Sequence, residues 1–288
     1  MKILVLGGDG MLGHVLLREL GSKHDLKVTL RNNIEFYNEF GLFNLENSFD
    51  EFEPMNSTSV QSIFCKFRPD VVINALGLIK QREKSEDKIL SLEINSLFPH
   101  KIAQICGCVG ARLIHLSTDC VFSGGKGRYV ESEVPDAVEL YGRTKYLGEC
   151  DYEHSVTLRT SFFGTELRHK SGLIEWFLAQ SGSIKGFSKA IYSGLSTSEM
   201  SNVINSVISD YPNMSGLWHV SSDPIDKYTL LVKLSEYLGR SDIEIKEDAS
   251  FLCDRSLDSQ RFRNLVGYQP PTWDNMLKEL AKQITQGV

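Results

Sequence analysis

A glycine-rich loop near the start of the chain limits the fold more than any other feature. The loop, LGGDGMLG, carries Gly7, Gly10 and Gly13 and joins the apolar run KILVL to the helix-like segment MLGHVLLREL. A nucleotide-binding turn needs a tight bend, a bare backbone where a pyrophosphate meets the helix N-terminus, and close packing of helix on sheet. The loop therefore predicts dinucleotide binding, and a purely structural tight turn is the alternative.

Apolar runs and helix-like segments alternate through the rest of the chain. A helix is expected at 96–110. Further strands are expected at 26–30, 70–77, 111–117, 156–164 and 216–222. Such alternation is typical of a parallel sheet covered on both faces, so the predicted class is α/β with a Rossmann-type doubly wound sheet.

The C-terminal part of the chain has a different texture, with helices interrupted by loops rich in Ser, Asp and Pro. The expected helices lie at 171–182, 227–239 and 272–284. We expect residues 1–165 to form the dinucleotide-binding domain and residues 166–288 a smaller substrate-binding region. Within this part, residues 191–222 are a candidate segment of the dinucleotide-binding domain, to which the chain would return.

Composition excludes several classes of protein. The net charge is −6, and no basic run is dense enough for a nucleic-acid partner, so a small-molecule partner is expected. The first apolar run is too short for a signal peptide and no later stretch would span a membrane, which predicts a cytoplasmic protein. The six cysteines include no CxxC pair, so disulfides are not expected. The histidines lack the spacing of metal ligands, so a metal site is not expected. The oligomeric state stays open, and a homodimer is compatible with the sequence.

The segment ELYGRTK places Tyr141 and Lys145 four residues apart, so both side chains share one face of a helix. A fixed ammonium beside a phenol favours the phenolate and makes the phenol a usable acid near neutrality. Tyr141 is the only one of the ten tyrosines with a lysine four residues on. The alternative is a surface contact in which the lysine lies across the ring.

Arg31 follows the second expected strand, where a side chain would face the adenosine ribose. An arginine there suits a 2′-phosphate, so NADP(H) is favoured over NAD(H), and a solvated surface arginine is the alternative. The segment NALG, residues 74–77, ends a later strand with small residues that let a dinucleotide approach.

Taken together, these motifs resemble the dTDP-4-dehydrorhamnose reductase family of the extended short-chain dehydrogenase/reductase superfamily. The segments that carry the resemblance are GGDGMLG, RPDVVINALG, LIHLSTDCVFSG, YGRTKYLGE and LRTSFFG, in this order. The resemblance implies a catalytic trio of Thr118, Tyr141 and Lys145. Thr118 would hydrogen-bond the substrate carbonyl and Tyr141 would deliver the proton. Lys145 would lower the pKa of the phenol and hold the nicotinamide ribose.

The resemblance also implies which residues hold the ligands, with Asn95 supporting the site through backbone or water contacts. The expected cofactor contacts are Gly7, Asp9, Gly10, Met11, Leu12, Gly13, Arg31, Asn74, Ala75, Leu76, Gly77, Asn95, Ser117, Tyr141, Lys145 and Thr160. The expected substrate contacts are Lys80, Asp119, Cys120, Val121, Trp176 and Arg255, where Arg255 would grip a diphosphate.

Two departures from the family pattern affect the substrate side. Cys120 stands where the family usually has Tyr, and SGLSTSEMS lacks the Pro that commonly precedes its Thr. The expected activity is NADPH-dependent reduction of the 4-keto group of a nucleoside-diphosphate 4-keto-6-deoxy sugar, in deoxysugar and surface polysaccharide biosynthesis. A dehydratase would need a Glu after Asp119, and Arg31 argues against an NAD-retaining epimerase. A regulatory subunit that binds NADP without catalysis is the remaining alternative.

Overall fold

The computed structural model describes residues 1–79, 86–168 and 170–287. Seven strands form one sheet in the order β11-β6-β5-β4-β1-β2-β3, and each neighbouring pair is parallel. The strands are β1 (Lys2–Leu6), β2 (Asp25–Thr29), β3 (Ser48–Phe49), β4 (Val71–Asn74), β5 (Arg112–Thr118), β6 (Ser155–Thr160) and β11 (Gly216–His219). The predicted α/β class with a doubly wound parallel sheet is confirmed.

The direction of winding reverses at β1. This strand pairs with β2 on one side and with β4 on the other, so the chain moves outward through β2 and β3 before it crosses back. In open parallel sheets a ligand crevice forms at such a reversal, beyond the carboxyl ends of the strands. The glycine loop leaves β1 at this point.

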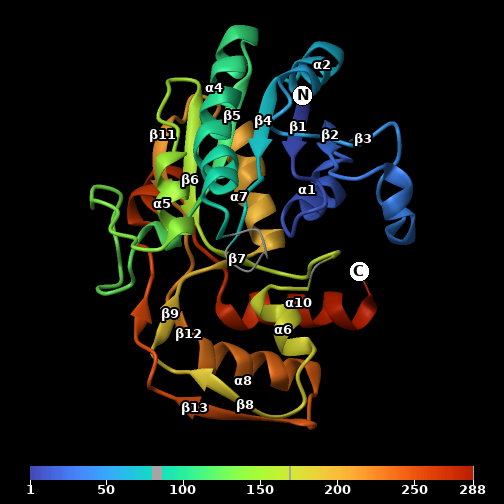
Figure 1. Cartoon of the computed structure of the whole chain (residues 1–288). Helices are drawn as coiled ribbons and strands as arrows, with labels where there is room; N and C mark the ends of the chain where they lie inside the picture. The colour runs from blue at the N-terminus through green and yellow to red at the C-terminus, as the bar shows by residue number, and fades with distance from the viewer. Residues whose placement is uncertain (80–85, 169, 288) are drawn as a thin grey trace.

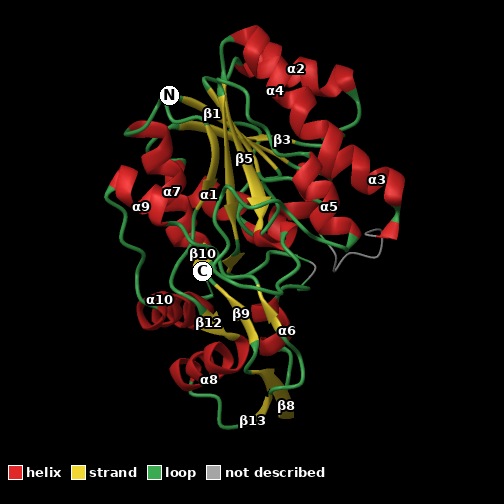
Figure 2. Cartoon of the chain, turned by 90° about the vertical axis from the view of Figure 1, so that its left-hand side faces the viewer, coloured by secondary structure: helices red, strands yellow, loops and turns green. Residues whose placement is uncertain are grey.

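Alternate residues of the strands pack on opposite faces of the sheet. Ile3 and Val5 join the core with α1 (Gly13–Leu20) and α7 (Thr197–Ser209), whereas Leu4 and Leu6 join the core with α2 (Ser57–Phe67) and α4 (Phe98–Val109). Figure 2 shows the sheet between these two helical layers. Burial on both faces explains why the strands have continuous apolar sequences.

A smaller lobe lies beyond the carboxyl edge of the sheet (Figures 1 and 2). Its strands are the parallel pair β8 (Gly182–Phe187) and β13 (Ile243–Asp248), and β9 (Ala190–Tyr192) between β12 (Ile225–Asp226) and β14 (Cys253–Asp254). Its helices are α6 (Leu173–Leu178), α8 (Lys227–Leu238) and α10 (Trp273–Gln286). Between β9 and β12 the chain returns to the main layers, where α7 packs on α1 and β11 pairs with β6.

Several elements differ from the sequence expectations. The helix expected at 171–182 ends at Leu178, and Gly182 begins β8, whose partner β13 lies about 60 residues later. The strand expected at 156–164 divides into β6 and the short β7 (Phe162–Phe163), which pairs with β10 (Leu195–Ser196). The sequence analysis did not anticipate β3, α2 or α9 (Gln260–Val266). Within the described residues, no helix has the length and apolar character needed to cross a membrane.

Candidate active site

The structure brings Thr118, Tyr141 and Lys145 together at the carboxyl end of β5. Thr118 ends β5, and the other two residues lie on α5 (Leu140–Leu147), where Thr118 hydrogen-bonds the Tyr141 phenol. Lys145 Nζ donates a 2.6 Å hydrogen bond to the carbonyl oxygen of Leu116, also on β5. The trio therefore spans one strand end and one helix face, as the four-residue spacing requires.

Two glycines let α5 approach its neighbours closely. A Cβ on Gly142 would overlap the carbonyl oxygen of Cys120, and a Cβ on Gly148 would overlap that of Asn95. Gly142 directly follows Tyr141, so a side chain there would push the phenol away from the strand end. The bare backbone of α5 thus determines how close Tyr141 lies to Thr118.

Burial has the largest effect on the phenol. It raises the pKa of Tyr141, and the charges of Cys120, Asp119 and Glu139 add to the rise, while the Thr118 hydrogen bond opposes it. The sequence predicts that the Lys145 charge controls this pKa, whereas in the structure desolvation has the largest effect and raises it. Tyr141 is therefore protonated at neutral pH and available as a proton donor.

Lys145 is 3% exposed. Burial lowers the pKa of its ammonium to about 8, against the opposing influence of Glu149 and Cys150. The ammonium is thus mostly charged at neutral pH and titrates only slightly above it.

The hydroxyl of Thr118 belongs to the turn that follows β5, the short helix η4 (Asp119–Val121). Its oxygen accepts a 3.1 Å hydrogen bond from the backbone N–H of Cys120, and its proton is directed to Asp119 Oδ1 at 3.1 Å. To bond a substrate carbonyl, Thr118 would only have to rotate its hydroxyl proton away from Asp119.

Asn95 lies in a π-helical segment, η3 (Glu93–Leu97), that precedes α4. Its amide oxygen accepts from Leu78 N at 2.8 Å, and its amide nitrogen donates to Leu78 O and to Thr144 Oγ1, both at 3.1 Å. Asn95 therefore ties the loop after β4 to α5, and both ends of its amide are used within the protein. Single π-helical turns are frequent at functional sites.

The glycine loop has the shape that a pyrophosphate requires. Gly7 has φ +95°, a Cβ on Gly8 would lie 2.5 Å from Val28, and a Cβ on Gly13 would overlap Gly7, so the loop is pressed against the sheet. A Cβ on Gly10 would instead meet only the Gly7 carbonyl oxygen, at 3.3 Å, among the described residues. The α1 N-terminus behind Leu12 has no side-chain cap in this part of the structure, so its N–H groups suit an anion. The loop residues therefore fit a dinucleotide.

Arg31 is exposed just after β2, and none of the hydrogen bonds or ion pairs between described residues involves its side chain. Asp9 accepts a 2.8 Å hydrogen bond from the hydroxyl of Tyr37, which lies in η1 (Ile34–Phe40). Asn32 donates to the same hydroxyl oxygen. Tyr37 is not among the residues predicted from the sequence, because nothing in the local pattern links it to a loop 28 residues earlier.

Three polar side chains expected at the cofactor are engaged within the protein. Asn74 Nδ2 lies 3.2 Å from His115 Nδ1, Ser117 donates to Glu149 at 2.6 Å, and Thr160 bonds the Ser161 carbonyl oxygen at 3.3 Å. Any cofactor contact from these positions is therefore most natural through the backbone. The segment after β4 consists of Ala75, Leu76 and Gly77. Met11 lies against Gly172, the residue before α6, because a Cβ on Gly172 would be 2.9 Å from Met11 Cε.

Buried charges lie directly behind the trio. Arg159 on β6 is 2% exposed and makes two 2.7 Å hydrogen bonds to the carboxylate of Glu149. The same carboxylate accepts from Ser117. The ion pair thus joins β5, β6 and the end of α5, and sequence reasoning did not identify it.

On the expected substrate side, Arg255 reaches from the smaller lobe to the η4 turn. Its guanidinium bonds Glu139 at 2.8 Å, the carbonyl oxygen of Phe122 at 3.0 Å and the Cys120 sulfur at 3.4 Å. Its ion-pair partner is Glu139, just before the start of α5. Arg255 links the two lobes across the crevice.

The remaining expected substrate contacts lie in different environments. Asp119 is buried and Cys120 is partly exposed, whereas the Val121 side chain is fully buried with Phe122. Trp176 on α6 is 40% exposed, while its neighbour Phe177 is in the core. Lys80 lies outside the described residues.

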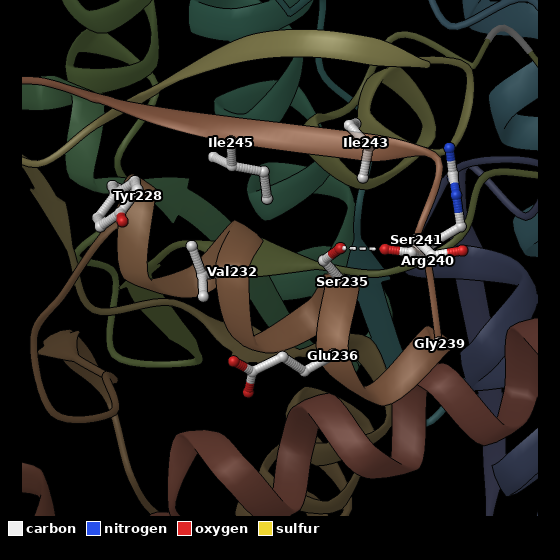
Figure 3. A pocket seen from close by; sticks show the side chains of 9 residues that line it. All are labelled: Tyr228, Val232, Ser235, Glu236, Gly239, Arg240, Ser241, Ile243 and Ile245. Atoms are coloured by element: carbon white, nitrogen blue, oxygen red, sulfur yellow. Dashed lines mark hydrogen bonds between the residues drawn. The ribbon is translucent and has the colours of Figure 1, made fainter.

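A separate hollow of about 430 Å³ lies between α8 and β13 (Figure 3). Its lining is Tyr228, Val232, Ser235, Glu236, Gly239, Arg240, Ser241, Ile243 and Ile245. None of these residues belongs to the trio, and both views place α8 and β13 at the far end of the smaller lobe (Figures 1 and 2). We therefore assign the chemistry to the sheet edge and not to this hollow.

Comparison with known proteins decides the family. A family model described as the RmlD substrate binding domain matches residues 1–230. The chain belongs to the dTDP-4-dehydrorhamnose reductase family of the extended short-chain dehydrogenases/reductases. The family resemblance that the motifs carried is thereby confirmed.

Individual relatives agree with this family. A dTDP-4-dehydrorhamnose reductase of Streptomyces griseus is 37% identical over 148 residues, which are 51% of this chain and 43% of that protein. This match and one to a dTDP-4-keto-6-deoxy-D-glucose reductase of Streptomyces niveus span less than half the length of each relative. The spore coat polysaccharide biosynthesis protein SpsK of Bacillus subtilis is 28% identical in an alignment of 300 positions that covers 98% of this chain and 97% of that protein.

Solved structures share the fold. A dTDP-4-dehydrorhamnose reductase of Bacillus anthracis, crystallised in complex with NADP, superposes with a TM-score of 0.79 and 21% identity. The superposition covers 98% of this chain and 99% of that chain. The fold of this chain, with its main sheet and smaller lobe, is therefore shared with that reductase.

Proposed function

We propose that this chain is an NADPH-dependent reductase of a nucleoside-diphosphate 4-keto-6-deoxy sugar. The observation that carries the proposal is the intact trio of Thr118, Tyr141 and Lys145 beside a glycine loop that fits a dinucleotide. The names of the Streptomyces relatives supply the substrate class. The name of the Bacillus subtilis relative favours a role in deoxysugar and surface polysaccharide biosynthesis.

The cofactor, when bound, supplies a hydride to the keto carbon. Gly7, Gly10 and the α1 N-terminus would hold its pyrophosphate, and Lys145 would hold the nicotinamide ribose. Exposed Arg31 favours a 2′-phosphate, so the proposal is NADPH in preference to NADH.

Tyr141 acts as the general acid in this scheme. Its raised pKa keeps the phenol protonated until negative charge develops on the substrate oxygen, to which it gives its proton. Thr118 donates a second hydrogen bond to that oxygen after turning its proton from Asp119. The Lys145 ammonium nearby then stabilises the phenolate that remains.

The proposed division of labour follows the two lobes. Residues 1–165 hold the cofactor and residues 166–288 bind the substrate, apart from 191–222, whose helix α7 and strand β11 complete the main layers. Arg255 and Trp176 are the proposed contacts of the smaller lobe with the nucleotide. We place the activity in the cytoplasm, because the spacing of the six cysteines in the sequence suits a reducing compartment.

A panel of keto-sugar nucleotides tests the proposal by loss of NADPH absorbance. A reductase consumes NADPH in proportion to the ketone added. A regulatory subunit would bind NADPH and change its fluorescence without consuming it, and a dehydratase or epimerase would change the sugar without net oxidation of cofactor. Either of the last two results would replace the proposed function.

A further inference from the structure

Close to the proposed active site lies a buried hydroxyl group that has no hydrogen-bond partner among the described residues. Tyr192 ends β9, its side chain is 9% exposed, and its hydroxyl oxygen is buried with no partner among the described residues. Buried polar groups nearly always have a partner in native structures, so an exception of this kind calls for an explanation.

The backbone places the Tyr192 ring at the carboxyl edge of the main sheet. A Cβ on Gly194 would lie 2.6 Å from Tyr192 Cε2 and 3.2 Å from the carbonyl oxygen of Ser161. Ser161 directly follows β6, whose last residue Thr160 pairs with Thr118. The ring thus lies one strand away from the trio.

A second path leads to the same place. The carbonyl oxygen of Ile191 accepts a 3.0 Å hydrogen bond from Arg255 N, and the Arg255 guanidinium contacts Cys120 and Phe122 in the η4 turn. Burial and then the Asp119 carboxylate raise the pKa of Tyr192, so the charge of Asp119, in the turn that follows Thr118, acts on the phenol.

Packing holds the ring in this position. The centroid of the Tyr192 ring lies 5.6 Å from that of Trp273, at 55° between the ring planes, and Ile225 of β12 pairs with the Tyr192 backbone. The contact with Trp273 and the pairing with β12 hold the ring beside the end of β6.

We propose that Tyr192 determines substrate specificity by donating a hydrogen bond to a ring hydroxyl of the sugar, while Asp119 accepts from the same hydroxyl. A sugar hydroxyl both donates and accepts hydrogen bonds, so a phenol donor and a carboxylate acceptor together complement it. A carboxylate accepts several hydrogen bonds, so the hydrogen bond from Thr118 to Asp119 leaves room for one from the sugar. The inference rests on the proposed reduction of a keto-sugar nucleotide and names a residue that selects its sugar. A site built to bond a hydroxyl rejects an analogue that lacks it.

Tyr192→Phe removes only the hydroxyl. It should raise KM for the keto-sugar nucleotide about tenfold, whereas kcat and the Kd of NADPH should stay within about twofold of the parent. The Tm of the ligand-free variant should equal or exceed that of the parent, because the lost hydroxyl has no partner to lose. A keto-sugar analogue without the recognised hydroxyl should be bound equally by parent and variant.

Tyr211→Phe is the matched control. Its hydroxyl donates a 3.2 Å hydrogen bond to the Val266 carbonyl oxygen, remote from the trio, so this variant should lower the Tm and leave KM unchanged. If Tyr192→Phe behaved like the control, the hydroxyl would be structural and the specificity role would be overturned while the reductase function stood. If the parent turned over no keto-sugar nucleotide, the proposed function would fail first, and this inference with it.

Discussion

Replacing Asn95 by alanine should weaken folding and catalysis together. The buried amide makes three hydrogen bonds, to both backbone groups of Leu78 and to Thr144. Each hydrogen bond contributes about 1 kcal/mol of net stability, and the variant also leaves the partner groups unsatisfied beside the helix that carries Tyr141 and Lys145. The free energy of unfolding should therefore fall by roughly 2–4 kcal/mol. Because η3 also presses on Gly148, α5 should shift, and kcat should fall at least about tenfold, since small displacements of positioned groups are costly.

The assay is urea unfolding followed by circular dichroism, paired with steady-state kinetics on the same preparation. Asn56→Ala is the matched control, because Asn56 Oδ1 caps α2 through Thr58 N and Ser59 N and its hydrogen bonds are confined to that helix. The control should cost about 1 kcal/mol of stability and leave kcat unchanged. Equal stability losses in the two variants, or an unaltered kcat in Asn95→Ala, would refute the reasoning.

Three further predictions concern charged residues of the site. The profile of kcat/KM against pH should fall on the alkaline side with an apparent pKa of about 8, because Lys145 is charged below that pH and neutral above it; a fall only above pH 10 would contradict this assignment. Arg31→Asp should move the ratio of kcat/KM values from NADPH towards NADH, and an unchanged ratio would make Arg31 an ordinary surface residue. Arg255→Ala should raise KM for the sugar nucleotide about tenfold or more at constant NADPH affinity, because a charge-assisted contact is lost; turnover of a free keto-sugar as fast as of its nucleotide would remove the diphosphate role.

The parts of the molecule that the sequence predicted are those built from neighbouring residues. The β1 strand, the glycine loop and α1 follow one another within 20 residues, and Tyr141 and Lys145 lie within one helix. Each leaves a local signal: an apolar run, a glycine spacing, a four-residue interval. The fold class followed because strands buried on both faces have continuous apolar sequences.

The parts that it did not predict depend on residues far apart in the chain. Arg255 bonds Glu139 across 116 residues, and Asp9 meets Tyr37 across 28. The β8–β13 pair forms between largely polar segments, in which the alternation of apolar and polar residues is confined to Ile243 and Ile245 of β13. Tyr192 reads as an ordinary strand residue, and only its position at the sheet edge sets its hydroxyl apart. Contacts of this kind have no periodicity that a sequence pattern could show.

Transfer of deuterium from NADPH that carries deuterium at both C4 positions of the nicotinamide tests the proposed hydride transfer most directly. The protein would be mixed with the labelled cofactor and a nucleoside-diphosphate 4-keto-6-deoxy sugar, and the sugar product analysed by mass spectrometry and NMR. We expect one deuterium at C4 of the product for the parent protein and nearly none for Tyr141→Phe, which should still bind the cofactor. Bound cofactor with an unlabelled sugar, or equal labelling by the Tyr141→Phe variant, would contradict it.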